Sequence, residues 1–433
     1  MSEQLSKAAP PVIGVSSTAI KMAELAVAQG ALFAFPLLFA IVCAGNLGPA
    51  NYGVVAFYTA LTSFLCTFVE FGFDSIGVRE VHVIGRHRDP SGVVWNVTLA
   101  KLLVCLVTTI ATVSVLLVTR SKAETSIIYA SACYMIAFAL DGGWYLRSLE
   151  LMRPVLVVAV VSRFAGIALL VLVVNGPEDV SQAMWTYAFM AWANAVAGWL
   201  LMHRSHVIGK PHLDLPHLKS LFSSGAKIVL GNLSGDSLTS GGVALLGAMA
   251  DPALTGAANI ALRLRNAGQA TMLPLIQLGF VRLSAVIATD RKAGIALGRK
   301  LFYVLMTLST TVAIAIIASA DRLVALVYRL PHAPQDAVVL VRLFAAGIPV
   351  SIAGVLFGLH CLTLFQQERA YVAVQLSASA IFFGLLLFTN ASHSVNYGWA
   401  LLVADVWIMF ASGLFLLRVV RAEMKSSRPG VGP

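Results

Sequence analysis

Apolar runs recur along the whole chain, and short polar segments separate them. Most runs hold about 20 residues, and an α-helix of that length crosses a hydrocarbon core of about 30 Å. The runs do not alternate apolar with polar positions, as the strands of a membrane β-barrel do. The pattern predicts about twelve transmembrane helices. They lie near residues 16–44, 54–74, 93–118, 125–145, 155–174, 183–202, 220–248, 254–285, 301–319, 338–364, 370–389 and 398–417.

The composition points to the same class of protein. Of the 433 residues, 58% are hydrophobic and 12% are charged. A soluble domain carries about 25% charged residues, so this chain has too little polar surface to cover a globule in water. The five cysteines fall in or beside apolar runs without metal-site spacing, and we interpret them as small apolar fillers. The predicted fold class is an all-α membrane protein.

The basic residues between the runs indicate the orientation of the chain. With the N-terminus placed in the cytoplasm, roughly 18 Lys and Arg residues lie on the cytoplasmic side and roughly 4 on the other, as the positive-inside rule requires. We therefore predict a multi-pass inner-membrane protein with both termini in the cytoplasm. The net charge of +10 comes from these scattered residues, so nucleic acid is not an expected partner.

A short motif occurs at equivalent places in the two halves of the chain. PANYG occupies 49–53, between the first two runs, and PALTG occupies 252–256, which is 203 positions later. We interpret the pair as a duplication into two parallel six-span repeats, a transporter architecture. The predicted domains are a six-helix bundle over 1–202, a cytoplasmic linker over 203–219, and a second six-helix bundle with a short cytoplasmic tail over 220–433. The two bundles are expected to surround a central cavity.

Enzyme motifs are absent from the sequence. It contains no GxxxxGK[ST], HExxH or GxSxG segment and no GxGxxG after a strand. The loops between the runs do not exceed about 20 residues, which leaves no room for a soluble catalytic domain. We expect no enzymatic activity and no cofactor, and any transport must be driven by something other than ATP hydrolysis in this chain.

Charged residues inside the predicted spans are the candidates for function, because charge is costly in a bilayer core. Arg263 lies about 16 Å into its span, on a helical face that also carries Asn259 and Asn266. The predicted substrate-binding residues of a cationic cavity are Arg263, Arg265, Lys21, Arg163, Lys227 and Arg342. The predicted coupling or counter-ion residues are Asp236, Asp405 and Glu24.

Such an excess of basic residues favours an anionic substrate, and guanidinium groups suit phosphate or pyrophosphate. A structural role is the alternative for these charges. Asp236, for example, would then form a buried ion pair with an arginine.

The region around the first PANYG motif resembles the Wzx-type polysaccharide flippases of the multidrug/oligosaccharidyl-lipid/polysaccharide exporter superfamily. That family carries an LGPxxYG turn between its first two helices, then a Gly-Phe pair, then Arg-Glu entering a cytoplasmic loop. The matching residues are LGPANYG at 47–53, Gly72-Phe73 and Arg79-Glu80. The span layout and the repeat extend the likeness along the chain, although the second motif has lost the glycine and tyrosine of the first.

The resemblance implies a flippase of the bacterial inner membrane. Its substrate would be an undecaprenyl-pyrophosphate-linked oligosaccharide repeat unit, moved by alternating access for O-antigen or exopolysaccharide synthesis. Coupling to protons or sodium ions is expected, as are membrane lipids and the polymerase and chain-length regulator of the pathway as partners. Two alternatives stay open: a drug or small-solute exporter of the same superfamily, and a membrane enzyme such as the polymerase.

Overall fold

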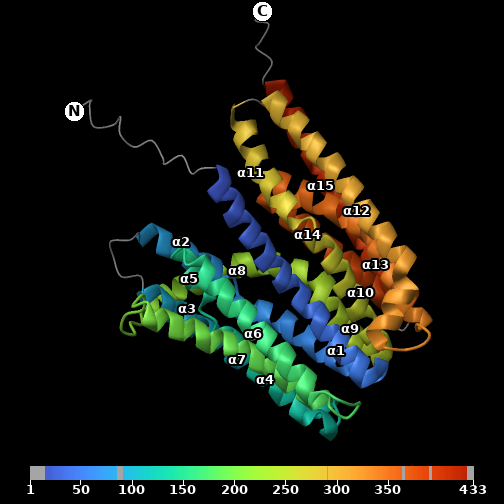
Figure 1. Ribbon diagram of the computed structural model, residues 1–433. Helices are drawn as coiled ribbons and strands as arrows, with labels where there is room; N and C mark the ends of the chain where they lie inside the picture. Colours follow the sequence, from blue (N-terminus) through green and yellow to red (C-terminus); the bar gives the residue numbers. More distant parts are fainter. Residues whose placement is uncertain (1–14, 85–90, 290, 363–365, 390–392, 427–433) are drawn as a thin grey trace, which may run out of the picture.

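The computed structural model describes residues 15–84, 91–289, 291–362, 366–389 and 393–426. The described residues form helices and connecting turns, with no strand among them (Figure 1). Eight of these helices are long and apolar enough to cross a membrane, or nine if one bent pair counts as a single span. The chain is an all-α membrane protein, as predicted, while the number of twelve spans stays a prediction.

The helices of the first half are α1 (Val15–Glu70), α2 (Phe73–Ile84), α3 (Ser91–Thr119), η1 (Lys122–Glu124), α4 (Thr125–Ala139), α5 (Gly143–Ser148), α6 (Met152–Val173) and α7 (Val180–Arg204). Those of the second half are α8 (Leu215–Asp236), η2 (Ser237–Gly241), α9 (Gly242–Met249), α10 (Pro252–Ala270), α11 (Leu273–Thr289), α12 (Arg291–Tyr328), α13 (Gln335–Val355), η3 (Leu356–Leu362), α14 (Glu368–Phe388) and α15 (Ser394–Ser426). The predicted linker over 203–219 thus overlaps the end of α7 and the start of α8, and its role as a domain boundary stays a prediction.

Helix α1 reverses direction at Gly48. This glycine has φ 78° and ψ 172°, a conformation that side chains with a Cβ rarely adopt. Pro49 follows it, and the fixed φ and missing N–H of proline suit the first turn of a new helix. Figure 1 shows the two parts of α1, dark blue and lighter blue, running in opposite directions. This one element therefore contains the predicted span 16–44 and most of the predicted span 54–74.

The matching motif of the second half begins α10. Asp251 caps this helix, because its Oδ1 accepts a hydrogen bond from the backbone N–H of Ala253 at 2.8 Å. Pro252 occupies the first helical position, as Pro49 does after the turn in α1. Both copies of the motif therefore start a helix with proline.

The two motifs pack against each other where α1 crosses α10. A Cβ added to Gly53 would overlap with the backbone carbonyl group of Pro252. A Cβ added to Gly256 would lie 3.0 Å from the ring of Tyr52 and 3.1 Å from the carbonyl oxygen of Pro49. Small residues let helix backbones approach this closely in membranes. The repeated motif therefore forms the junction between the two halves.

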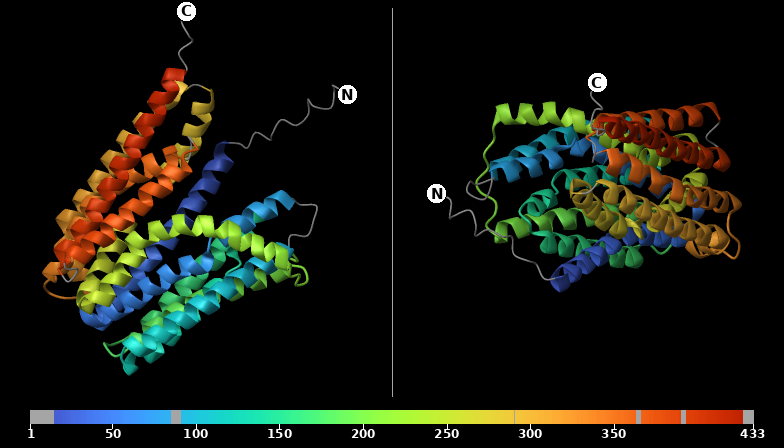
Figure 2. Two further views of the ribbon diagram at one scale, coloured as in Figure 1. Left: turned by 180° about the vertical axis from the view of Figure 1, so that it is seen from behind. Right: turned by 90° about the horizontal axis from the view of Figure 1, so that it is seen from above.

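The halves converge at this crossing and diverge toward the end where α1 begins and α15 ends (Figures 1 and 2). Hydrogen bonds tie further segments together at the converging end. The Arg329 guanidinium, just after α12, donates to Asn46 Oδ1 at 2.6 Å, and Asn46 Nδ2 donates to the Val174 carbonyl oxygen at 2.6 Å. Asn51 Nδ2 donates to the Pro177 carbonyl oxygen at 2.9 Å. The loop between α6 and α7 is therefore attached to the turn in α1.

The predicted span 254–285 is broken in the structure. It forms α10 and α11, which meet at an angle of 44°. Pro274 occupies the second position of α11, where its ring and missing N–H prevent the helix from continuing through Thr271 and Met272. Polar residues at the end of α10 find partners outside the helix, since Gln269 Nε2 donates to the Ser351 hydroxyl at 3.0 Å.

Among the described residues, two ion pairs include a buried side chain. Arg265 on α10 and Asp405 on α15 are 2.8 Å apart, and their side chains are only 7% and 6% exposed. Lys101 on α3, 1% exposed, lies 2.9 Å from Asp74 on α2. In a low-dielectric interior each partner lowers the cost of burying the other. The first pair therefore connects two helices that are distant in sequence, and the second connects two consecutive helices.

The close packing of Gly53 against α10 predicts that a larger residue at this position lowers the stability of the protein. Gly53→Ala should force α1 away from α10 and lower the apparent free energy of unfolding by about 1–3 kcal/mol, the usual cost of overpacking. The measurement is denaturant unfolding of the purified protein in detergent. Gly384→Ala in α14 is the matched control, since a Cβ there meets no atom within 4 Å, and it should be neutral or slightly stabilising. Equal stability of Gly53→Ala and the wild type would contradict the junction.

The buried ion pair predicts that the effects of substitutions at Arg265 and Asp405 on the free energy of unfolding are strongly non-additive. Arg265→Met leaves the Asp405 carboxylate buried without its partner and should cost about 3–5 kcal/mol, whereas Arg265→Met with Asp405→Leu should recover most of that loss. Arg342→Met is the control, because it breaks an exposed pair with Asp321 whose side chains are 49% and 53% exposed. That change should cost less than about 1 kcal/mol. A double variant less stable than Arg265→Met would contradict a structural role for the pair.

Candidate functional site

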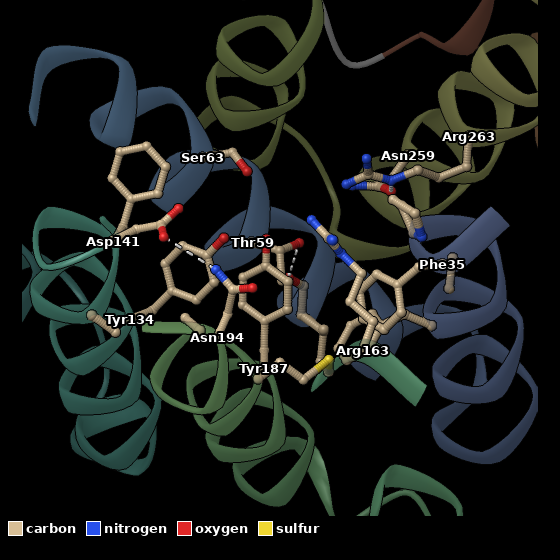
Figure 3. Close-up of a pocket in the computed structure, with 18 of the residues that line it drawn as sticks. Phe35, Thr59, Ser63, Tyr134, Asp141, Arg163, Tyr187, Asn194, Asn259 and Arg263 are labelled. Carbon is tan, nitrogen blue, oxygen red and sulfur yellow. Dashed lines mark hydrogen bonds between the residues drawn. The ribbon is translucent and has the colours of Figure 1, made fainter. Parts of the chain in front are cut away.

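A cavity of about 300 Å³, here called the main pocket, lies between the two halves of the chain (Figure 3). Helices α1, α4, α6 and α7 of the first half and α10 of the second half line it. The charged residues among the lining residues are Arg163, Arg263 and Asp141. The remaining lining residues are aromatic, aliphatic or small and polar. The pocket therefore combines polar and apolar surface in similar proportion, so it offers both hydrogen-bonding groups and apolar contact to a ligand.

Arg263 reaches the main pocket from α10. Its Nε donates a hydrogen bond to Asn259 Oδ1 at 3.2 Å, one helical turn earlier. The same oxygen accepts a hydrogen bond from the Tyr52 hydroxyl on α1, also at 3.2 Å. Asn259 thus links the orientation of Arg263 to the crossing of α1 and α10. The terminal guanidinium nitrogens of Arg263 form no ion pair within 4 Å in the described part of the chain.

Arg163 reaches the same pocket from α6. Its guanidinium lies over the ring of Phe35, with 5.9 Å from its central carbon to the ring centroid. Its Nη1 donates to the Ala159 carbonyl oxygen at 3.4 Å, and no carboxylate of the described residues lies within ion-pair distance. Figure 3 shows the guanidinium groups of Arg163 and Arg263 facing the same part of the pocket. Two such groups are suited to hold a phosphate or carboxylate anion.

Asp141 and Asn194 form a polar corner on another side of the pocket. Asp141 lies between α4 and α5, where the predicted span 125–145 is interrupted. Its Oδ1 accepts hydrogen bonds from the Gly143 backbone N–H at 3.0 Å and from Asn194 Nδ2 at 3.3 Å. The helix break thus turns a carboxylate toward the pocket and holds it in place. A carboxylate here accepts hydrogen bonds from hydroxyl or amide groups.

An aromatic wall lies beside this corner. The rings of Tyr134 on α4 and Tyr187 on α7 stack with 4.4 Å between centroids and 4° between planes. Phe39 on α1 packs against Tyr187 at 5.4 Å. The main pocket therefore combines two arginines, one carboxylate–amide pair and flat aromatic surfaces.

The other predicted site residues lie elsewhere. Arg265 is paired with Asp405 and borders a separate cavity of about 150 Å³ next to Asn266 and Gln269. Asp236, at the end of α8, accepts a hydrogen bond from the Thr67 hydroxyl on α1. The structure thus brings Arg163 and Arg263 together in the main pocket and places Arg265, Asp405 and Asp236 outside its lining.

Arg342 forms its exposed pair with Asp321 and does not line the main pocket. The side chains of Lys21, Glu24 and Lys227 lie outside the described residues. Among the described residues, no three His, Cys, Asp or Glu side chains are grouped as a metal site requires.

Sequence reasoning missed the aromatic wall and the role of Asn194. A tyrosine in an apolar span looks the same in sequence whether it faces lipid, the core or a cavity. Asn194 lies in the middle of a predicted span, and a buried amide there was the available signal, because polar groups in membrane helices usually face a partner or a cavity.

Comparisons with known proteins show which proteins the chain is similar to. The family model described as "Polysaccharide biosynthesis protein" matches residues 21–281. A relative from Escherichia coli (strain K12), named "Putative O-antigen transporter", is 24% identical over 409 residues, covering 91% of this chain and 96% of the relative.

Two solved structures share the fold. One is an inward-facing multidrug resistance MATE family transporter of the MOP superfamily, with a TM-score of 0.69 at 13% identity, covering 93% of this chain and 99% of that chain. The other is the lipid II flippase MurJ in an inward closed conformation, with a TM-score of 0.69 at 11% identity, covering 92% of this chain and 90% of that chain. Since the family match spans more than half of the sequence, the chain belongs to the polysaccharide biosynthesis protein family, in line with the family resemblance of the motif at 47–53.

Proposed function

We propose that this protein is a flippase that carries undecaprenyl-pyrophosphate-linked oligosaccharide repeat units across the bacterial inner membrane. The observation that carries the proposal is the pair of arginines in the main pocket. Arg163 and Arg263 come from different halves of the chain, and neither forms an ion pair within 4 Å in the described structure. Unpaired charge in a membrane is costly, which supports a ligand that neutralises it during transport.

The charge of the pocket suits an anion. The lining contains two guanidinium groups and one carboxylate, so it carries a net charge of +1. Each charge-assisted hydrogen bond to phosphate contributes about 1.5–3 kcal/mol, and a pyrophosphate offers acceptors to both arginines at once. We assign the pyrophosphate of the lipid carrier to this pair.

The relatives support a lipid-linked glycan as substrate. The Escherichia coli relative bears the name of an O-antigen transporter, and MurJ is described as a lipid II flippase. We carry these names over to this chain as transport of a lipid-linked oligosaccharide for O-antigen or exopolysaccharide synthesis. The polymerase and the chain-length regulator of the same pathway are then its expected partners.

Alternating access provides the mechanism. The halves touch at the crossing of α1 with α10 and diverge at the other end, where α1 begins and α15 ends. With both termini in the cytoplasm, this arrangement is open to the cytoplasm, and transport requires the crossing to separate while the diverging end closes. We propose that proton or sodium movement drives this exchange, with Asp236 as the leading candidate because it bonds to Thr67 across the α1–α8 contact.

The fold does not separate this proposal from a drug exporter, because the MATE transporter and MurJ match equally well. The pocket chemistry does separate them. An exporter of cationic drugs would need acidic residues in excess, whereas arginines are in excess here. We assign transport, not catalysis, to the chain, in line with the names of its relatives.

The arginine pair predicts a selective loss of export. Arg163→Gln and Arg263→Gln should each weaken substrate binding by about 10–100-fold, since each removes charge-assisted hydrogen bonds worth about 1.5–3 kcal/mol. The measurement is surface polysaccharide in a strain that lacks the native gene and expresses each variant, with the amount of membrane-inserted protein determined in parallel.

Arg322→Gln is the matched control, because Arg322 is an exposed arginine of α12 outside the main pocket. It should export as the wild type does. Wild-type amounts of surface polysaccharide from both pocket variants would remove the arginine pair from the mechanism.

A further inference from the structure

The main pocket has two chemically different sides. The arginines face one part of it, while the stacked Tyr134 and Tyr187 and the Asp141–Asn194 pair line another (Figure 3). An anion site alone does not require the second side. Its aromatic rings and its fixed carboxylate therefore call for a separate explanation.

The stacked tyrosines cover one face of each other, so the outer surface of the pair is what a ligand in the pocket can contact. Both side chains line the pocket and come from neighbouring helices, α4 and α7. A sugar ring has one face made mainly of C–H groups, and such a face packs on an aromatic ring and loses contact with water. Tyrosine provides this surface at little cost in side-chain entropy.

The Asp141–Asn194 pair complements the edge of such a ring. Asp141 Oδ1 is occupied by Gly143 and Asn194, whereas no hydrogen bond to Oδ2 is found within the described residues. The side-chain oxygen of Asn194, Oδ1, likewise accepts no hydrogen bond from the described residues. These two acceptors suit hydroxyl and acetamido N–H groups. Arg147 also lines the side of the corner, but it forms no ion pair with Asp141 within 4 Å among the described residues, so a carboxylate placed against Asp141 Oδ2 is repelled.

There is room for the sugar beside the phosphate. A second cavity of about 260 Å³, the side pocket, adjoins the main pocket and shares Asp141, Arg163 and Asn194 with it. Arg163 thus lines both cavities, and Figure 3 shows it between Asn194 and Arg263. A sugar at the corner would be the one attached directly to a phosphate held by the arginines.

We propose that Tyr134, Tyr187, Asp141 and Asn194 form a sugar-recognition subsite that reads the first sugar of the lipid-linked substrate. This subsite selects a neutral or N-acetylated sugar over an acidic one, while Arg163 and Arg263 hold the pyrophosphate without regard to the sugar. The inference rests on the proposed flippase function and adds the determinant of its specificity.

Binding of synthetic probes to the purified full chain in lipid nanodiscs tests the subsite. The probes are farnesyl pyrophosphate, either bare or carrying N-acetylglucosamine or glucuronic acid on its terminal phosphate, and calorimetry measures their affinities. The wild type should bind the N-acetylglucosamine probe about tenfold more tightly than the bare probe, from stacking and hydrogen bonds. It should bind the glucuronic acid probe less tightly than the N-acetylglucosamine probe.

Variants of the subsite should change the preference among the sugar-bearing probes without changing the affinity for the bare pyrophosphate probe. Tyr134→Leu should reduce the tenfold ratio to about one while the bare probe binds as before. Asp141→Asn should strengthen binding of the glucuronic acid probe, a gain that a misfolded protein does not produce. Tyr129→Leu is the matched control on the same helix, since Tyr129 is 50% exposed and does not line the pocket, and it should leave all three affinities unchanged.

The possible outcomes distinguish a failure of the subsite proposal from a failure of the proposed function. If Tyr134→Leu and Asp141→Asn both keep the wild-type preference, the subsite is wrong although the flippase function stands. If the wild type does not bind the bare probe, or if Arg163→Gln leaves its affinity unchanged, the pyrophosphate site and the proposed function fail instead.

Discussion

Where α1 crosses α10, two backbones approach so closely that Gly53 leaves no space for a side chain against the carbonyl group of Pro252. In a bilayer, apolar side chains gain little by exchanging lipid for protein, so close backbone packing carries much of the association energy of helices. The same crossing positions the main pocket. Arg263 lies seven residues beyond Gly256, about 10 Å along α10, and Asn259 connects it to Tyr52.

The charged residues inside the helical bundle fall into two groups. Arg265 and Lys101 are buried and paired with carboxylates of other helices, and such pairs connect helices. Arg163 and Arg263 instead face a cavity between the halves. The physical difference is the source of the neutralising charge: another helix in the first case and, in the proposed mechanism, the substrate in the second.

Much of the fold could be predicted from the sequence. Hydropathy indicated an all-α membrane protein, and the repeated PAxxG motif marked the segments that meet at the junction. The family motif at 47–53 now has a physical meaning: Gly48 permits the turn, Pro49 starts the next helix, and Tyr52 and Gly53 contact α10. The break between α10 and α11 was not predicted, because hydropathy averages over a proline such as Pro274 that interrupts an apolar run.

The candidate site was less accessible to sequence reasoning. Depth along a span singled out Arg263 and Arg265 alike, but only tertiary structure shows that Arg265 has Asp405 as its partner, 140 residues away. The pairing of Asp236 with an arginine was an alternative from sequence, and the structure shows a hydrogen bond to Thr67 instead. Tyr134 and Tyr187 gave no signal, because helical periodicity does not distinguish a cavity wall from a core.

The central claim is that this protein moves a lipid-linked repeat unit across the membrane. Mass spectrometry of polyprenyl-linked lipids in a strain that lacks the protein, read together with its surface polysaccharide, tests that claim most directly. The account predicts that complete lipid-linked repeat units accumulate and that not even a single unit reaches the surface. Single repeat units that still reach the surface without being polymerised would contradict it, and would place the protein with the polymerase instead.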